Sequence, residues 1–197
     1  MLLRTVRAFA REPAVVEIVI ALPESLVHAP PPWLTAMGSE RIRLVTGGAS
    51  RAESVQAALA ALSPASTIVL VHDAARPFVP AETIRRVIER ARTGVGAVAA
   101  VPVSDTLKRA TGPDDRVLET VRRDQLWRAQ TPQGFPRAML QAAYRSAVER
   151  NDLATATDES CLAEAAGFPV YLVPDQSTNI KITVNDDLVF AESLARS

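Results

Sequence analysis

The sequence predicts an α/β domain built on a doubly wound, mostly parallel sheet of the Rossmann-like type. Apolar runs rich in valine and isoleucine recur along the chain, and their nearly continuous hydrophobicity is typical of strands buried on both faces. Segments with the periodicity of amphipathic helices lie between several of these runs. Strands that alternate with helices in this way favour an open parallel sheet covered by helices on both sides.

The predicted elements follow in chain order. The first is a helix over residues 2–11, where Leu3, Val6 and Phe9 share one face. Strands are predicted at 15–21 (VVEIVIA), 42–45 (IRLV), 67–72 (TIVLVH) and 97–103 (AVAAVPV), and helices at 51–61 and 81–92. The stretch APPPW at 29–33 is expected to form a surface loop. The second half is expected to add helices at about 136–150 and 158–167, a strand at 170–173 and a helix from Asn185 to the end.

Residues 105–131 interrupt the alternation of strands and helices. The segments DTLKRA and RVLETV flank the turn-rich TGPDD, and this pattern predicts a β-hairpin. An exposed two-stranded arm is only marginally stable alone and usually packs on something else. We therefore expect one domain over residues 1–197, with an arm at about 105–131 that contacts a second copy of the chain.

The composition narrows the class of protein and its partners. The 22 basic and 22 acidic residues balance, so no overall field attracts nucleic acid or an anionic membrane. The apolar runs are far shorter than the ~20 residues of a membrane span, and the N-terminus lacks the pattern of a signal peptide. The single cysteine, Cys161, excludes an internal disulfide and a cysteine-rich zinc site. These observations favour a cytoplasmic protein that binds neither nucleic acid nor membrane.

The segment HDAARP directly follows a predicted buried strand. It therefore lies at the carboxyl edge of the sheet, where open α/β folds bind ligands. Asp73 there can hold a divalent metal or a substrate hydroxyl, and Arg76 can face a phosphate. The alternative is a local ion pair between Asp73 and Arg76 that closes a turn. We expect His72 to be structural.

Two weaker signals lie elsewhere in the chain. Gly47 and Gly48 precede a predicted helix, whose first N–H groups can bind an anion, although alone this pattern more often makes a turn and a cap. Only two of the 22 basic residues, Lys108 and Lys181, are lysines, and a compact ammonium can donate to a phosphate oxygen. For each lysine, a phosphate contact and a solvent-exposed position are about equally supported.

Taken together, these segments resemble the 2-C-methyl-D-erythritol 4-phosphate cytidylyltransferase family of the non-mevalonate isoprenoid pathway. The resemblance runs from about residue 46 to residue 183. It rests on GG…RAESV, VLVHDAARPFV, PVSDTLKR, ETVRRDQLWRAQTPQGF, ATDE and NIKIT.

The resemblance implies transfer of CMP from CTP to a sugar-alcohol phosphate, with release of pyrophosphate and with a divalent metal, usually Mg2+. It also implies a Rossmann-like nucleotidyltransferase sheet and a homodimer whose arms complete each other's sites. The residues implied to bind the nucleotide are Gly48, Ala49, Ser54 and Ala74. Those implied to surround the sugar phosphate are Asp73, which would also hold the metal, Arg76, Thr106, Thr131 and Thr157, with Arg123 and Lys181 as the catalytic pair that positions the phosphate.

The chain departs from the family pattern in two places. Arg122 stands where the family usually has an acidic residue. The family also opens with a strand, a glycine-rich loop and a Pro-Lys-Gln segment, and none of these precedes Met1. We therefore expect Met1 to be an internal methionine of a longer protein, and residues 1–197 to show little or no catalysis and reduced stability.

Three other functions compete with this interpretation. D-ribitol 5-phosphate cytidylyltransferases have a similar HDA-x-RP segment, but Leu126-Trp127 and the DTLK segment at 105–108 favour methylerythritol phosphate. A non-catalytic dimeric module that binds sugar phosphates is a second alternative. A dinucleotide-dependent oxidoreductase is disfavoured, because the chain contains no GxGxxG.

Overall fold

The strands of the body divide between two sheets. In the computed structural model, which describes residues 1–37 and 41–196, β1 (Ile18–Leu22) pairs in parallel with β2 (Ile42–Thr46). The second sheet has the order β3–β7–β4–β8, formed by Ile68–Val71, Trp127–Pro136, Gly96–Pro102 and Val170–Pro174. Within it β4 and β8 are parallel, whereas β7 is antiparallel to both of its neighbours. No strand pairing joins the two sheets among the described residues.

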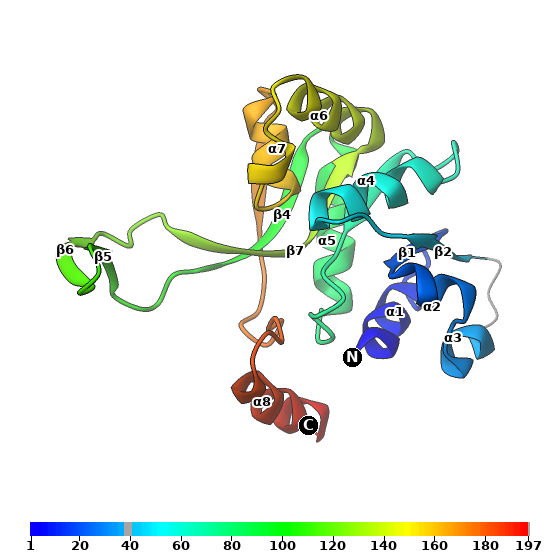
Figure 1. The fold of residues 1–197 in the computed structure, drawn as a ribbon, viewed down its shortest axis with the longest axis horizontal. Helices are drawn as coiled ribbons and strands as arrows, with labels where there is room; N and C mark the ends of the chain where they lie inside the picture. Colours follow the sequence, from blue (N-terminus) through cyan, green and yellow to red (C-terminus); the bar gives the residue numbers. More distant parts are fainter. Residues whose placement is uncertain (38–40, 197) are drawn as a thin grey trace.

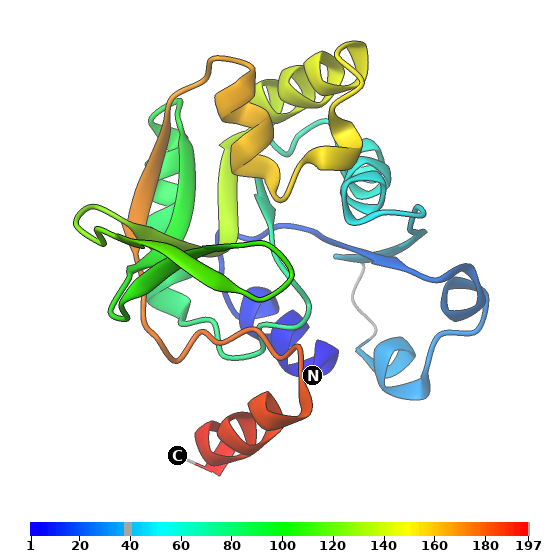
Figure 2. The ribbon, with the colours of Figure 1, turned by 60° about the vertical axis from the view of Figure 1, so that its left-hand side comes forward.

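Helices cover both faces of the four-stranded sheet (Figures 1 and 2). Val69 and Val71 of β3 pack in a core with α4 (Arg51–Ala61), α6 (Arg137–Glu149) and α7 (Glu159–Ala165). Leu70, which alternates with them, packs with α1 (Leu2–Ala10) and α5 (Ala81–Arg92). This alternation of partners places the two helix groups on opposite faces, because successive strand residues point to opposite sides. None of the helices in the described ranges is both long and apolar enough to cross a membrane.

Most of the predicted elements are confirmed. The helices α4 and α5 have the bounds expected from the sequence, and α8 (Asn185–Arg196) begins at the expected residue. Residue 197, the last of the predicted final helix, lies outside the described residues. One prediction was only partly right: residues 29–31 of the expected proline-rich loop lie outside any helix or strand, but Pro32 and Trp33 begin α3 (Pro32–Ala36). The short α2 (Glu24–His28) precedes this segment. Pro32 occupies the first helical turn of α3, where its missing N–H costs no hydrogen bond.

The strand β7 is the element that the sequence did not predict. Its residues TPQGFP lack the β-branched run that marks a strand, yet β7 lies in the middle of the sheet between β3 and β4. Gly134 lets it approach α5 closely, since a Cβ at this position would lie only 2.6 Å from Cγ1 of Val87. Burial between two strands and a helix, rather than local propensity, therefore determines this strand.

The predicted hairpin is present as β5 (Leu107–Thr111) and β6 (Arg116–Val121), which pair antiparallel and project away from the body (Figure 1). Positive φ angles at Gly112 (74°) and Asp115 (51°) turn the chain between them. Val117 and Leu118 on this arm are more than half exposed. The hairpin thus presents apolar side chains outside the core.

Candidate functional site

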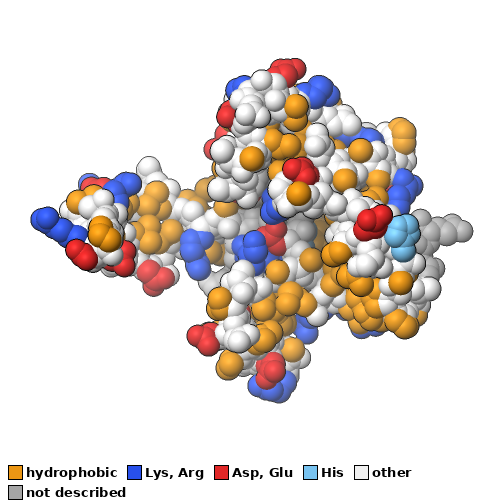
Figure 3. Space-filling model, viewed as in Figure 1, with side chains coloured by type: hydrophobic (Ala, Val, Ile, Leu, Met, Phe, Trp, Pro, Cys, Tyr) orange, Lys and Arg blue, Asp and Glu red, His pale blue; other side chains and the backbone are white. Residues whose placement is uncertain are grey.

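Three cations surround the Asp73 carboxylate, just after β3. Lys181 Nζ lies 3.1 Å from Oδ2, Arg51 Nε lies 3.2 Å from Oδ1, and Arg76 Nε lies 3.7 Å from Oδ2. The structure therefore brings together Asp73, Arg76 and Lys181, as expected for the carboxyl edge of the sheet. Figure 3 shows basic side chains around a recess in the middle of one face of the molecule, between the arm and the body.

The charge of Asp73 is set by these neighbours. Burial alone would raise the pKa of its carboxyl, but the hydrogen bond from Lys181 and the charge of Arg51 outweigh burial and hold that pKa below its ordinary value. Asp73 is therefore ionised at neutral pH. The rim, formed by Asp73 with Arg51, Arg76 and Lys181, carries three cations, and Glu159 is a second carboxylate that pairs with Arg51. The cations thus outnumber the two carboxylates, which suits a phosphorylated ligand.

Asn179 fixes the segment that carries Lys181. It is fully buried, and its Nδ2 donates to the Thr131 carbonyl at 2.9 Å and to Asp175 Oδ2 at 2.7 Å. The backbone carbonyl of Asn179 accepts from Nη1 of Arg76 at 2.9 Å. The middle of β7, Asp175 just after β8 and the Asp73–Arg76 turn thus hold Asn179, two residues before Lys181, which places the ammonium beside Asp73.

The half-buried His72 stabilises the turn through hydrogen bonds. The Arg76 carbonyl, 3.0 Å from Nε2, can only accept, so Nε2 carries the proton and Nδ1 accepts from the Thr131 hydroxyl at 3.0 Å. The Thr131 oxygen in turn accepts from the Asp73 N–H at 3.0 Å. Burial lowers the pKa of His72 to about 4, so the ring is neutral at pH 7. The expected structural role of His72 agrees with these contacts, and the Thr131 hydroxyl is also committed inside the protein.

The candidate nucleotide loop closes on its own side chains. The Gly48 N–H donates to Ser54 Oγ at 3.1 Å, and the Ala49 N–H donates to the Glu53 carboxylate at 2.8 Å. Ser50 caps α4 by accepting from the Glu53 N–H at 3.2 Å. A Cβ on Gly48 would lie 2.2 Å from that of Glu53, so the turn requires glycine there. The loop is therefore a rigid turn whose N–H groups stand at the start of a helix.

The backbone of Ala74 is fixed from the opposite side. Its carbonyl accepts a hydrogen bond from the buried hydroxyl of Thr5 at 3.0 Å. Thr5 belongs to α1, so the first helix of the chain supports the turn that carries Asp73.

Three of the predicted site residues lie apart from the Asp73 cluster. Arg123 and Thr106 are exposed beside the arm, where Arg123 donates to the Ser104 carbonyl. Thr157 is also exposed, and its hydroxyl lies 3.1 Å from the sulfur of Cys161. Across residues 1–37 and 41–196, no hydrogen bond or ion pair joins any of the three to Asp73 or Lys181. One chain alone therefore does not bring Arg123 and Lys181 together through such a contact.

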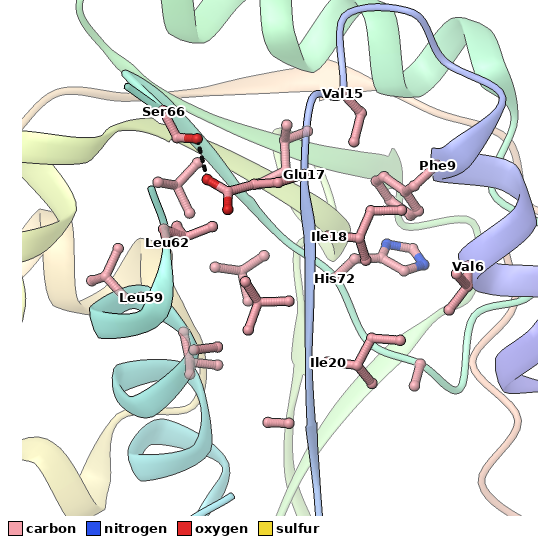
Figure 4. Close-up of a pocket in the computed structure, with 18 of the residues that line it drawn as sticks. Val6, Phe9, Val15, Glu17, Ile18, Ile20, Leu59, Leu62, Ser66 and His72 are labelled. Atoms are coloured by element: carbon pink, nitrogen blue, oxygen red, sulfur yellow. Dashed lines mark hydrogen bonds between the residues drawn. The ribbon is translucent and has the colours of Figure 1, made fainter. Parts of the chain in front are cut away.

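An apolar groove runs between β1 and β3 and reaches this cluster. It measures about 670 Å³, and Arg51, Asp73 and Lys181 line it together with side chains of β1, β3 and α4. Figure 4 shows Ile18 and Ile20 of β1 on one side and Leu59 and Leu62 on the other. At one point the Ser66 hydroxyl donates to the Glu17 carboxylate across the groove. The charged rim therefore continues into an apolar cleft between the two sheets.

The rim offers a metal ion a single carboxylate ligand. Among the described residues no group of three or more His, Cys, Asp and Glu side chains could hold a metal ion. Mg2+ commonly takes one or two carboxylates and completes its shell with water and substrate phosphates. Asp73 alone thus fits a metal that arrives with a nucleotide, in competition with Lys181 for the same oxygens.

The sequence matches the family model for 2-C-methyl-D-erythritol 4-phosphate cytidylyltransferase (IspD) over residues 1–197. The chain belongs to this family. A relative from Salinibacter ruber with that enzyme name is 46% identical over 98% of this chain and 80% of its own length. A bifunctional enzyme IspD/IspF from Desulfotalea psychrophila is 41% identical over 100% of this chain and 49% of its own length. The chain thus spans about half the length of the bifunctional relatives that it matches.

The solved structures of IspD proteins agree with the fold. The crystal structure of 2-C-methyl-D-erythritol 4-phosphate cytidylyltransferase from Thermus thermophilus matches with a TM-score of 0.85 at 38% identity, over 100% of this chain and 89% of that one. The predicted Rossmann-like nucleotidyltransferase fold is therefore confirmed.

Two charged residues of the Asp73 cluster were not predicted from the sequence. Arg51 and Glu159 occupy the first positions of α4 and α7, within the RAESV and ATDE segments. Charged residues at helix starts usually interact with the helix end, so the local pattern gave no reason to single them out. Only the structure shows that Arg51 reaches both Asp73 and Glu159.

Proposed function

We propose that this site transfers CMP from CTP to 2-C-methyl-D-erythritol 4-phosphate. The products are 4-diphosphocytidyl-2-C-methyl-D-erythritol and pyrophosphate. The observation that carries the proposal is the convergence of Lys181 and Arg76 on Asp73 in a chain of the IspD family. The alignment with the Salinibacter ruber relative, whose name is that of this enzyme, covers 98% of this chain at 46% identity.

The reaction needs positioned charge rather than a protein nucleophile. A phosphate oxygen of the acceptor attacks the α-phosphorus of CTP, the new P–O bond forms, and the bond to pyrophosphate breaks. Both reactants carry several negative charges, so cations that hold them together lower the barrier. Mg2+, when bound, would neutralise charge on the nucleotide phosphates, with Asp73 as its protein ligand.

The cations at the rim differ in how exposed their side chains are, which suggests different roles. The Lys181 side chain is 42% exposed, so its ammonium can leave Asp73 and donate to the acceptor phosphate. The Arg76 side chain is only 12% exposed and already donates to the Asn179 carbonyl. We infer that Lys181 contacts the phosphate, whereas Arg76 orients the turn and adds charge.

The cytidine nucleotide is proposed to bind at the turn before α4 and at Ala74. The N–H groups of Gly48 and Ala49 stand at the helix start, where the helix dipole favours an acceptor. In the structure Ser54 and Glu53 occupy these donors, so binding would replace side-chain acceptors by ligand atoms. The Ser54 oxygen would then be free to accept from the nucleotide, while its hydroxyl donates to the Ser50 carbonyl at 2.9 Å.

A second copy of the chain is proposed to supply the arm residues. Arg123 and Thr106 make no hydrogen bond or ion pair with the Asp73 cluster within the described chain, and the exposed apolar residues of the arm favour an interface. In this arrangement Arg123 of one copy would face Lys181 of the other, on opposite sides of the acceptor phosphate.

The free thiol of Cys161 is consistent with a cytoplasmic location.

The proposal is tested by calorimetry and by pyrophosphate release with purified protein, CTP, Mg2+ and either methylerythritol phosphate or ribitol 5-phosphate. Methylerythritol phosphate should bind more tightly, and Lys181→Gln should weaken its binding about tenfold or more. Arg85→Gln removes an exposed cation on α5 that has no hydrogen bond or ion pair to Asp73 among the described residues, and it should leave binding unchanged. Equal affinity for both acceptors, or an unaltered affinity in Lys181→Gln, would contradict the assignment.

A further inference from the structure

Glu159 is a buried charge that none of the proposed contacts with ligands uses. Glu159 is 1% exposed and lies at the start of α7. A buried carboxylate needs both charge and hydrogen-bond partners to offset the loss of water. Arg51 supplies two of these hydrogen bonds, from Nη1 and Nη2 at 2.9 Å each, and the Tyr144 hydroxyl supplies a third at 3.2 Å.

The third nitrogen of the same guanidinium faces the site. Arg51 Nε donates to Asp73 Oδ1 at 3.2 Å, while Nη1 and Nη2 are both held by Glu159. Because a guanidinium is planar and rigid, a fork fixed at one end also fixes the direction of Nε. By orienting Arg51, Glu159 thus determines that Oδ1 of Asp73 accepts from Arg51 and that Oδ2 remains for Lys181.

Arg51 also joins the two candidate ligand-binding segments. It is the first residue of α4, directly after the Gly48–Ser50 turn, and its side chain ends on the Asp73 turn. We propose that Arg51 is a positioning residue, which Glu159 locks in place and which couples the nucleotide turn to the rim formed by Asp73 and Lys181. Its use in catalysis rests on the proposed function, whereas the coupling itself does not.

The chain contains a matched pair for comparison. Glu12 is 6% exposed and pairs with Arg85 of α5 at 3.6 Å, so it is also a buried carboxylate held by a half-exposed arginine. No hydrogen bond or ion pair in the described ranges links this pair to Asp73. Glu12→Gln therefore controls for the general cost of disturbing a buried carboxylate.

Amide hydrogen exchange tests the coupling without any ligand. The Asp73 N–H bonds to Thr131 and the Arg76 N–H bonds to the Asp73 carbonyl, so both report on the turn. In Glu159→Gln and in Arg51→Lys, exchange at these two amides should rise about tenfold more than global unfolding explains, and in Glu12→Gln it should not. Unchanged exchange in Glu159→Gln would overturn the proposal, as would full protection in Arg51→Lys, because charge alone would then suffice.

Ligand affinity provides the second readout. If the turn is coupled, Glu159→Gln should lower the affinity for CTP about tenfold to hundredfold, whereas Glu12→Gln of similar stability should bind like the parent. Faster exchange with parental CTP affinity would mean that Arg51 only stabilises the fold, and would overturn its role as a positioning residue. If the parent chain binds neither CTP nor methylerythritol phosphate, the proposed function fails, and exchange alone decides the coupling.

Discussion

Lys181 and Asp73 form an ion pair of 3.1 Å although they lie in opposite halves of the sequence. The pair exists because the buried Asn179 fixes one segment and β3 delivers the other. Asp73 balances two further cations, Arg51 and Arg76, so this carboxylate stabilises the rim.

We predict that Asp73→Asn lowers the free energy of unfolding by about 1–3 kcal/mol. Arg76 is mostly buried and would lose its charged partner, while the exposed part of Lys181 lessens the cost. Urea unfolding at pH 7 measures the change. Asp124→Asn removes an exposed carboxylate that pairs with Arg122, and its effect should be near zero. Equal losses in the two variants would show that the Asp73 cluster adds no stability.

His72 makes the stability of the fold depend on pH. Its pKa falls from 6.5 to about 4 on folding, so the unfolded chain binds the proton more tightly. The contribution of His72 to the free energy of unfolding is therefore fully present above pH 6.5 and is lost as the pH falls toward 4. Between pH 7 and pH 5 the loss is about 2 kcal/mol. His72→Gln should flatten the urea-derived stability profile across this window.

The only other histidine provides the control for that measurement. His28 is exposed on α2, and its ring lies 3.6 Å from the exposed Glu24. His28→Gln should keep the slope of the parent protein between pH 7 and pH 5. A slope that survives His72→Gln would assign the pH dependence to other groups.

Gly134→Ala should destabilise the protein by about 1–3 kcal/mol. A methyl group at this position meets Val87 Cγ1 at 2.6 Å and the backbone oxygen of Val87 at 3.3 Å, so β7 and α5 would have to separate. Gly112→Ala on the arm meets no atom within 4 Å and carries only the cost of its positive φ. Thermal unfolding should therefore separate the two variants, and a larger loss for Gly112→Ala would refute the packing argument.

The sequence predicted those parts of the structure that local patterns encode. α4 was located from its helical spacing after the Gly47–Gly48 turn, and Asp73 was placed at the sheet edge because it follows a buried strand. β7 escaped prediction because its strand character comes from neighbours distant in the sequence. Arg51 and Glu159 escaped for a related reason: each looks like an ordinary helix-start charge until the fold brings them within 2.9 Å.

The arm is expected to hold two copies of the chain together. Val117 and Leu118 are 55% and 57% exposed on β6, which is costly unless another surface covers them. The double substitution Val117→Lys and Leu118→Glu should shift sedimentation from dimer to monomer and leave the unfolding of the body unchanged. Val148→Lys places one charge on an exposed apolar position of α6 and should not affect the dimer. A parent protein that sediments as a monomer at every concentration would exclude the proposed interface.

The groove between the sheets should bind apolar dyes in the native state. Its lining by β1, β3 and α4 is largely aliphatic, and its volume of about 670 Å³ admits a ligand the size of anilinonaphthalene sulfonate. Ala58 lines the groove, whereas Ala60 lies on the exposed face of the same helix. Ala58→Glu should therefore abolish most of the dye fluorescence and Ala60→Glu should not, because only the first carboxylate enters the cleft. If both variants still bind the dye like the parent, the dye occupies another apolar surface, and the arm would be the next one to test.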